Sequence, residues 1–303
     1  MKPAIRLVQI CCIVAFPLGA SLAAEDASIE RLLSKLPPPE KLIQPSSQKA
    51  ASADPKVAKQ LDALFREAVV AANLGKYRDA IASLERATKL QPDDPVLYYG
   101  LSDCALRLGR KRDSVDYAKK AVALIPSNVY VWLQLAKAEN SLDHYEAALN
   151  AMAKAAEVSP DSGELQAVLG FSCINLNRIA QAIPPLERAA RLLPQDYLVQ
   201  SQLGYCLMRI GKIDAAISHL RNGASLNSHY GPVWDHLGFA YREQNQHEKA
   251  IKAFERATQL MPKSRLTWQH LANEYRLLGR LKDADKAAAH AGGFAPRRSQ
   301  NKS

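Results

Sequence analysis

Cysteine is scarce in this chain of 303 residues, which has only 5. Cys11 and Cys12 lie in an N-terminal segment with the features of a signal peptide, and the other three form no CxxC pair. An odd number without metal-ligand spacing predicts neither a disulfide framework nor a zinc site. We therefore expect Cys104, Cys173 and Cys206 to be small buried residues that pack between helices.

Catalytic and cofactor-binding motifs are missing as well. The sequence contains no HExxH, GxSxG, GxGxxG or phosphate-binding Walker loop, and no pairing of nucleophile and base stands out. Of its seven histidines, His236 and His270 are closest to a matched pair, but one helical repeat separates them, which is too far for a shared metal. The sequence predicts no enzyme, and it predicts no catalytic, cofactor-binding or metal-binding residues.

Long apolar runs are also few, and the clearest lies at the N-terminus. Lys2 and Arg6 precede an apolar stretch at 7–16, Pro17 interrupts it, and small residues follow up to Ala23. This order is typical of a secretory signal peptide, here residues 1–23. We expect an exported protein, in the periplasm of a Gram-negative bacterium. The alternative is an uncleaved segment that anchors the chain to the inner membrane.

Residues 24–53 differ in composition from the rest and are rich in proline, serine and alanine, which is typical of a linker. Within them, Ile29, Leu32, Leu33 and Leu36 have the spacing of a short amphipathic helix that Pro37 ends. We expect this segment to rest on its own domain. Docking to a partner or contact with a membrane surface is the alternative.

The remainder is a helical repeat array of residues 54–298, followed by a basic tail at 299–303. Ala80 and Ala250 occupy the same place in two similar phrases, and their separation, 250 − 80 = 170, is five times 34. Windows of 34 residues fit end to end without a gap. They are 61–94, 95–128, 129–162, 163–196, 197–230, 231–264 and 265–298. Positions are numbered below from the first residue of each window.

Small and apolar residues recur at fixed positions of these windows, as packed helices require. Position 20 is alanine in six windows and serine in one, and position 27 is alanine or glycine in all. Position seven is leucine except at Glu67, and position 32 is proline except at Ser228 and is expected to end the second helix. These columns predict two helices per window that pack face to face.

One window comes close to a known repeat signature. The stretch "WDHLGFAY" from Trp234 to Tyr241 is followed by Ala250, Phe254 and Pro262. This pattern resembles the tetratricopeptide repeat family, whose 34-residue unit is a helix-turn-helix. The resemblance implies an all-α, right-handed α-solenoid that is stabilised by stacking of neighbouring repeats. It also implies that the first helices line a concave groove and the second helices form the convex back.

In this family, positions 2, 5, 9, 12 and 13 of the first helices build the groove that binds a partner. Carried onto this chain, they give Phe65, Tyr99, Asp103, Arg107, Tyr130, Lys137, Asn140, Phe171, Asn175, Tyr205, Arg209, Phe239, Arg242, Asn273 and Arg276. Aromatic, amide and basic side chains of this kind suit a protein or peptide ligand. The alternative is that some of the aromatic residues only pack between adjacent first helices.

The formal charge of +10 does not point to nucleic acid, because the groove columns hold five basic and five acidic residues and so lack a basic stripe. We predict a non-catalytic scaffold that binds a protein or peptide, in envelope assembly or secretion, without nucleic acid. Membrane contact would involve only the N-terminal segment, and the sequence does not define an oligomeric state. The alternative function is binding of an exported anionic polysaccharide by the basic exterior.

Overall fold

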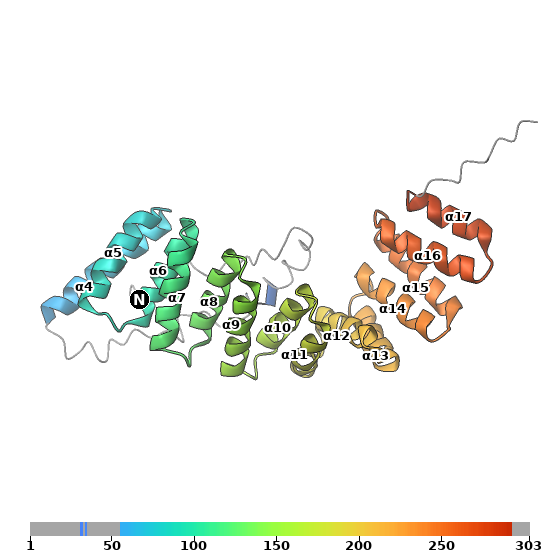
Figure 1. Ribbon diagram of the computed structural model, residues 1–303, viewed down its shortest axis with the longest axis horizontal. Helices are drawn as coiled ribbons and strands as arrows, with labels where there is room; N and C mark the ends of the chain where they lie inside the picture. Colours follow the sequence, from blue (N-terminus) through green and yellow to red (C-terminus); the bar gives the residue numbers. More distant parts are fainter. Residues whose placement is uncertain (1–30, 33, 35–54, 293–303) are drawn as a thin grey trace, which may run out of the picture. The chain divides into compact units, whose positions relative to one another are not determined.

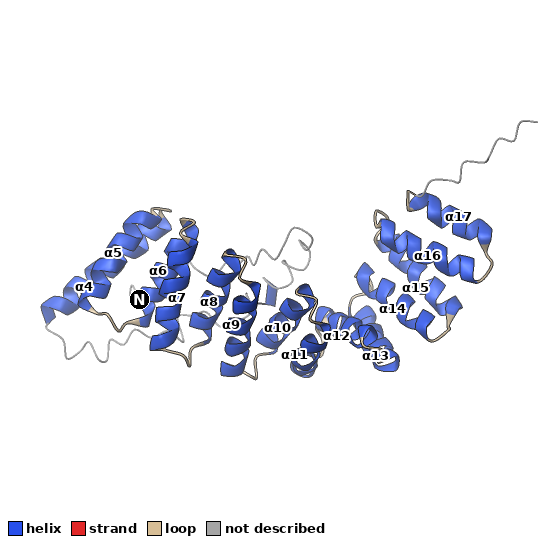
Figure 2. Ribbon diagram, viewed as in Figure 1, coloured by secondary structure: helices blue, strands red, loops and turns tan. Residues whose placement is uncertain are grey.

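The computed structural model describes residues 31, 32, 34 and 55–292, and residues 55–292 form fourteen helices without a strand (Figures 1 and 2). The predicted signal peptide, the basic tail and most of the linker lie outside the described residues, as do Ile29, Leu33 and Leu36. Contacts divide the chain into two compact units, which are residues 1–178 (unit 1) and 179–303 (unit 2). The boundary lies between the two helices of the fourth window.

In unit 1, seven helices follow one another, and each packs against the next (Figure 1). They are α4 (Pro55–Asn73), α5 (Tyr77–Leu90), α6 (Pro95–Arg107), α7 (Lys111–Leu124), α8 (Val129–Ser141), α9 (Tyr145–Val158) and α10 (Gly163–Asn175). The even-numbered helices are the first helices of their windows, and the odd-numbered helices are the second. α6 also packs against α8, so first helices of successive repeats are neighbours.

Unit 2 has the same plan, again with each helix packed against the next. Its helices are α11 (Ile179–Leu192), α12 (Tyr197–Arg209), α13 (Ile213–Leu226), α14 (Gly231–Glu243), α15 (His247–Leu260), α16 (Arg265–Leu277) and α17 (Leu281–His290). None of the fourteen helices is long and apolar enough to cross a membrane. The prediction of an all-α array of paired helices is confirmed.

Most first helices begin at a side-chain cap at position 34 of the preceding window. An aspartate, asparagine or serine there accepts a hydrogen bond from a backbone N–H of the first turn, which has no helical acceptor. The cap residues are Asp94, Asn128, Ser162, Asp196 and Ser264, at 2.8–3.3 Å from the nitrogen. The exception is Tyr230, before α14, where no side chain caps the helix.

The turn between the two helices of each repeat depends on one left-handed residue at position 15. All seven residues there have φ between 56° and 80°, and four of them are glycine, which adopts this conformation without strain. The other three are Asp143, Asn177 and Asn245, of the types that best tolerate it. The residue type at position 15 is therefore explained by the left-handed backbone conformation of the turn.

The small-residue columns lie where the two helices of a repeat meet. Ala80, Ala182, Ala216 and Ala250 at position 20 are 0% exposed. At position eight, a Cβ added to Gly238 would lie 2.5 Å from the Phe254 ring, which is far inside contact distance. These residues let the helices approach closely, as the sequence pattern indicated.

Position four shows why tryptophan and glutamine exchange in this array. In five repeats, a side-chain N–H at this position donates to the backbone carbonyl at position 32 of the preceding window. The donors and distances are Trp132 (2.8 Å), Gln166 (3.4 Å), Gln200 (3.3 Å), Trp234 (3.0 Å) and Trp268 (3.0 Å). The signature tryptophan therefore ties successive repeats together, and glutamine makes the same bond.

Candidate partner-binding faces

The sequence-predicted groove residues fall into two sets, one on the first helices of each unit. The first-helix face of unit 1 consists of Phe65, Tyr99, Asp103, Arg107, Tyr130, Lys137, Asn140, Phe171 and Asn175. The first-helix face of unit 2 consists of Tyr205, Arg209, Phe239, Arg242, Asn273 and Arg276. The two faces differ in burial and in electrostatics.

On the first-helix face of unit 1, the aromatic side chains are buried. Phe65, Tyr99 and Tyr130 are 5–7% exposed and belong to one apolar cluster with leucines of α4, α5 and α6. Phe171 on α10 is also 5% exposed. These aromatic side chains therefore pack inside unit 1, against residues of both first and second helices.

The charged residues of the same face neutralise one another. Asp103 is 2% exposed, and its carboxylate accepts hydrogen bonds from Arg107 Nε at 2.7 Å and Lys137 Nζ at 3.2 Å. Lys137 lies one repeat beyond Asp103, so this ion pair also joins α6 to α8. A buried carboxylate requires such partners because it has lost its water. Much of the hydrogen-bonding capacity of Arg107 and Lys137 is therefore used inside the unit.

Amide side chains complete the first-helix face of unit 1. Asn140 is 3% exposed, and Asn175 is partly buried. The Nδ2 atom of Asn175 is buried and donates to no other described residue. A buried amide nitrogen without an acceptor costs free energy, so this end of the face is a place where a further acceptor would be stabilising.

On the first-helix face of unit 2, each repeat instead presents an arginine beside the residue at position nine. Arg209 donates to Tyr205 Oη at 2.6 Å, and Arg276 donates to Asn273 Oδ1 at 3.0 Å. The Arg242 guanidinium lies over the Phe239 ring, 4.5 Å from its centroid. The result is a column of three arginines, here meaning one near the end of each of α12, α14 and α16, at position 13 in α12 and at position 12 in α14 and α16.

These arginines have little carboxylate nearby. Among the described residues, no acidic group lies within salt-bridge distance of Arg209 or Arg276, while Arg242 has Glu243 at 3.5 Å. Arg209, Asn273 and Arg276 are exposed, and Arg242 is partly exposed. A guanidinium presents a planar set of donors that matches carboxylate or phosphate groups. The exposed guanidinium groups of Arg209 and Arg276 can therefore bind an anionic group.

His236 on α14 and His270 on α16 both pack their rings against aromatic residues. The His236 ring lies 4.8 Å from Tyr205, and His270 lies 4.3 Å from Phe239. His270 Nδ1 is 3.0 Å from an Asp235 oxygen, but His236 Nδ1 is buried with no hydrogen-bond partner in the described chain. Burial lowers the pKa of His236 to about 4, so the ring is neutral at neutral pH.

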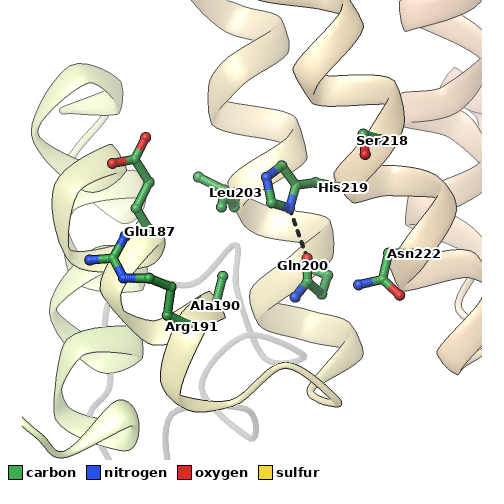
Figure 3. A pocket seen from close by; sticks show the side chains of 8 residues that line it. All are labelled: Glu187, Ala190, Arg191, Gln200, Leu203, Ser218, His219 and Asn222. Atoms are coloured by element: carbon green, nitrogen blue, oxygen red, sulfur yellow. Dashed lines mark hydrogen bonds between the residues drawn. The ribbon is translucent and has the colours of Figure 1, made fainter.

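A pocket that the sequence did not reveal lies in unit 2 between α11, α12 and α13, with a volume of about 400 Å³ (Figure 3). It is lined by Glu187, Ala190, Arg191, Gln200, Leu203, Ser218, His219 and Asn222. Figure 3 shows Glu187 and Arg191 across from His219, whose Nδ1 lies 2.8 Å from Gln200 Oε1. Burial lowers the pKa of His219, against the opposing effect of Glu187. The lining suits a small polar group.

No regular spacing could have identified this pocket, because its residues come from three helices and are mostly polar residues of second helices. The sequence also missed a buried carboxylate on α16. Glu274 is 0% exposed, and one of its oxygens lies 2.6 Å from His247 Nδ1 at the start of α15. The cysteines behave as expected, since Cys104, Cys173 and Cys206 are buried and form no disulfide.

Comparisons with protein families agree with the helix pairs. Family models described as tetratricopeptide repeat match residues 65–129, 129–162 and 231–264. The last two ranges coincide with two of the 34-residue windows. The chain therefore contains tetratricopeptide repeats in these ranges, and the all-α array of helix pairs continues the same arrangement through the described residues 55–292.

Solved structures show the same fold. The chain is similar to YrrB, described as a TPR protein with an unusual peptide-binding site, with 21% identity and a TM-score of 0.54 over 61% of this chain and 95% of YrrB. It is also similar to MamA, with 23% identity and a TM-score of 0.50 over 54% of this chain and 89% of MamA. No curated protein sequence matches the chain.

Proposed function

We propose that this protein is a non-catalytic scaffold and that it binds an acidic protein segment through the first-helix face of unit 2. The observation that carries the proposal is the column of Arg209, Arg242 and Arg276, on three successive first helices and largely without acidic partners in the described chain. Like charges on one face repel one another and so reduce the stability of the unit. A bound anionic ligand would offset this repulsion.

The spacing favours an extended ligand. Packed helices lie about 8–10 Å apart, and an extended chain rises about 3.3 Å per residue. A bound strand that runs across α12, α14 and α16 would thus bring about every third residue to the next arginine. The aromatic rings of Tyr205 and Phe239 beside the arginines offer apolar contact area at a low cost in side-chain entropy.

The cellular role we propose is assembly of the cell envelope or secretion, with the protein in the periplasm. The supporting observation is the signal-like order of charged, apolar and small residues at 1–23. N-terminal sequencing of the protein from cells tests this directly. A chain that begins near Ala24 supports export with cleavage, and one that begins at Met1 contradicts it.

Crosslinking in cells followed by mass spectrometry tests the binding face. The test variant is Arg209→Ala/Arg242→Ala/Arg276→Ala, and the matched control is Arg188→Ala/Arg221→Ala/Lys252→Ala, which removes three exposed charges from second helices. We expect the amount of the main crosslinked partner to be at least tenfold lower with the test variant than with the parent chain. With the control variant, that amount should be unchanged. Equal capture by both variants contradicts the proposal.

The control variant also tests the alternative function. If an anionic polysaccharide binds the basic exterior, its binding should fall with the second-helix variant and with added salt, because many weak charge contacts add up. Binding that depends on Arg209, Arg242 and Arg276 alone supports the protein ligand.

A further inference from the structure

The last repeat carries an apolar surface. Leu266 and Leu277 on α16 are 61% and 65% exposed, and Leu281 at the start of α17 is 63% exposed. Leu266 and Leu277 are about three helical turns apart, which places them on the same side of α16. The terminal unit of a repeat array normally has a polar outer face, because no neighbour covers it. Three leucines that are this exposed on one terminal repeat therefore indicate a contact surface.

The equivalent positions of earlier repeats are covered. Positions two and five are buried or partly buried in the first six windows, whereas Leu266 and Gln269 at these positions of the last window are exposed. A contact in unit 2 shows that the following repeat reaches position five. His270, at position six of the last window, places its Nδ1 atom 3.0 Å from a carboxylate oxygen of Asp235, at position five of the window before. No first helix follows α16 among the described residues, so its outer side is one half of a repeat-to-repeat interface.

The first repeat exposes the other half of that interface. Position three is at most 2% exposed in the second to seventh windows, but Ala63 at this position of the first window is exposed. Position ten is buried or partly buried in the same six windows, but Val70 is 57% exposed. In unit 2, position ten is contacted by position 17 of the preceding repeat, since Glu274 lies 2.6 Å from His247 Nδ1. Position 17 of the last window is the exposed Leu281.

We propose that the last repeat of one copy of this chain stacks on the first repeat of a second copy, so that the array continues from molecule to molecule. Each end supplies the half of the repeat interface that the other end needs. The register of positions 17 and ten brings Leu281 of one copy to Val70 of the other. Both side chains are apolar, so their contact removes hydrocarbon surface from water. This complementarity makes a second copy the occupant of the apolar surface.

The contact is head-to-tail, so the same two surfaces can join further copies into a chain or a closed ring. The arginines at the two ends do not oppose one another as free charges. Arg66 on α4 pairs with Asp62, and Arg280 before α17 pairs with Asp283. The proposal uses end surfaces only, and it does not rest on the function proposed for unit 2.

Sedimentation equilibrium of the protein purified from cells tests this. Val70→Glu changes the first-repeat end, and Leu281→Glu changes the last-repeat end. The matched control is Leu192→Glu, which places the same charge on an exposed leucine of α11, at neither end. We expect the mass of the parent chain to rise above that of the monomer as its concentration increases. Each end variant should raise the dissociation constant at least tenfold, because the contact would bury a carboxylate without a cation. The control should leave it unchanged.

A mixture of the two end variants gives the sharpest result. The Val70→Glu chain keeps its last-repeat end and the Leu281→Glu chain keeps its first-repeat end, so the mixture should form pairs with the affinity of the parent chain and stop at pairs. This recovery also shows that both variants are folded. A parent chain that stays monomeric, or a mixture that does, would overturn the proposal. An effect of Leu281→Glu without one of Val70→Glu would also overturn it, because that result indicates a symmetric contact between two last repeats. No other protein is present, so each result leaves the function proposed for unit 2 untouched.

Discussion

The first-helix faces of units 1 and 2 occupy the same repeat positions, but they differ in the burial of position nine and in ion pairing. In unit 1, the acid at position nine is buried and holds two cations, and in unit 2 the amide at position nine is exposed beside an exposed arginine. The repeat register thus determines where a side chain points, and the neighbouring groups determine whether it is available to a ligand.

The strongest test of this difference is truncation at position nine in each unit. Asp103→Ala should destabilise unit 1 by about 3 kcal/mol, because it removes a buried carboxylate that accepts hydrogen bonds from both Arg107 and Lys137. Asn273→Ala, on an exposed site, should cost less than about 0.5 kcal/mol. Hydrogen exchange of the helices on each side of the substitution measures both. Similar losses for both variants would mean that the two faces are energetically alike.

The next largest expected effect is that a fall in pH destabilises unit 2 more than unit 1. The pKa of His236 in the folded protein, about 4, lies below its ordinary value of 6.5, so the neutral ring contributes stability above about pH 6.5. That stability is lost as pH falls towards 4, by on the order of 2–3 kcal/mol. The groups that face this ring are Asp235, His270 and Tyr205. Unit 1 has only His144, whose side chain is 58% exposed, so unit 2 should open first.

Hydrogen exchange at pH 7 and pH 5 gives the readout for both units. His236→Phe keeps a ring against Tyr205 and removes the titrating group, so most of the acid sensitivity of α12 to α16 should disappear. The Asp235–His270 and Glu274–His247 contacts are left unchanged by this substitution. If the variant is as acid-sensitive as the parent chain, His236 is not the responsible group.

The sequence was informative about packing because packing repeats. Alanine at position 20, leucine at position seven and proline at position 32 recur at intervals of 34, and each column meets the same neighbour in every repeat. Even the exception at Glu67 is explained, since this first-repeat residue meets Ser83 and Arg86 near the end of the array. Periodicity therefore predicted the helix pairs and the small-residue contacts.

The same periodicity could not predict which positions on the first-helix faces are covered. The burial of Asp103 depends on Lys137, which lies one repeat away. The pocket lined by Glu187, His219 and others depends on side chains that no repeat column shares. The burial of face residues and the pocket arise from differences between repeats. A periodic pattern in one sequence does not show what such differences do in the folded chain.

A smaller effect is expected where close helix packing in unit 2 rests on glycine. Gly238→Ala places a Cβ 2.5 Å from the Phe254 ring, which is fully buried and cannot rotate away, so the free energy of unfolding should fall by about 2 kcal/mol. In unit 1, position eight is already alanine at Ala136, opposite the more adaptable Met152. Adding Phe254→Met to Gly238→Ala should recover part of the loss in urea denaturation. No recovery would place the strain elsewhere.

The smallest predicted effect is one in which the two units should not differ. Ser162 and Ser264 cap first helices of unit 1 and unit 2, and each accepts a backbone N–H at 3.3 Å. A helix cap acts within one turn, so it is independent of what covers the first-helix face. Ser162→Ala and Ser264→Ala should therefore each cost about 1 kcal/mol, measured by urea denaturation. Equal costs would locate the difference between the units in the ligand-facing positions alone, whereas a much larger cost at Ser162 would show that unit 1 is more tightly coupled throughout.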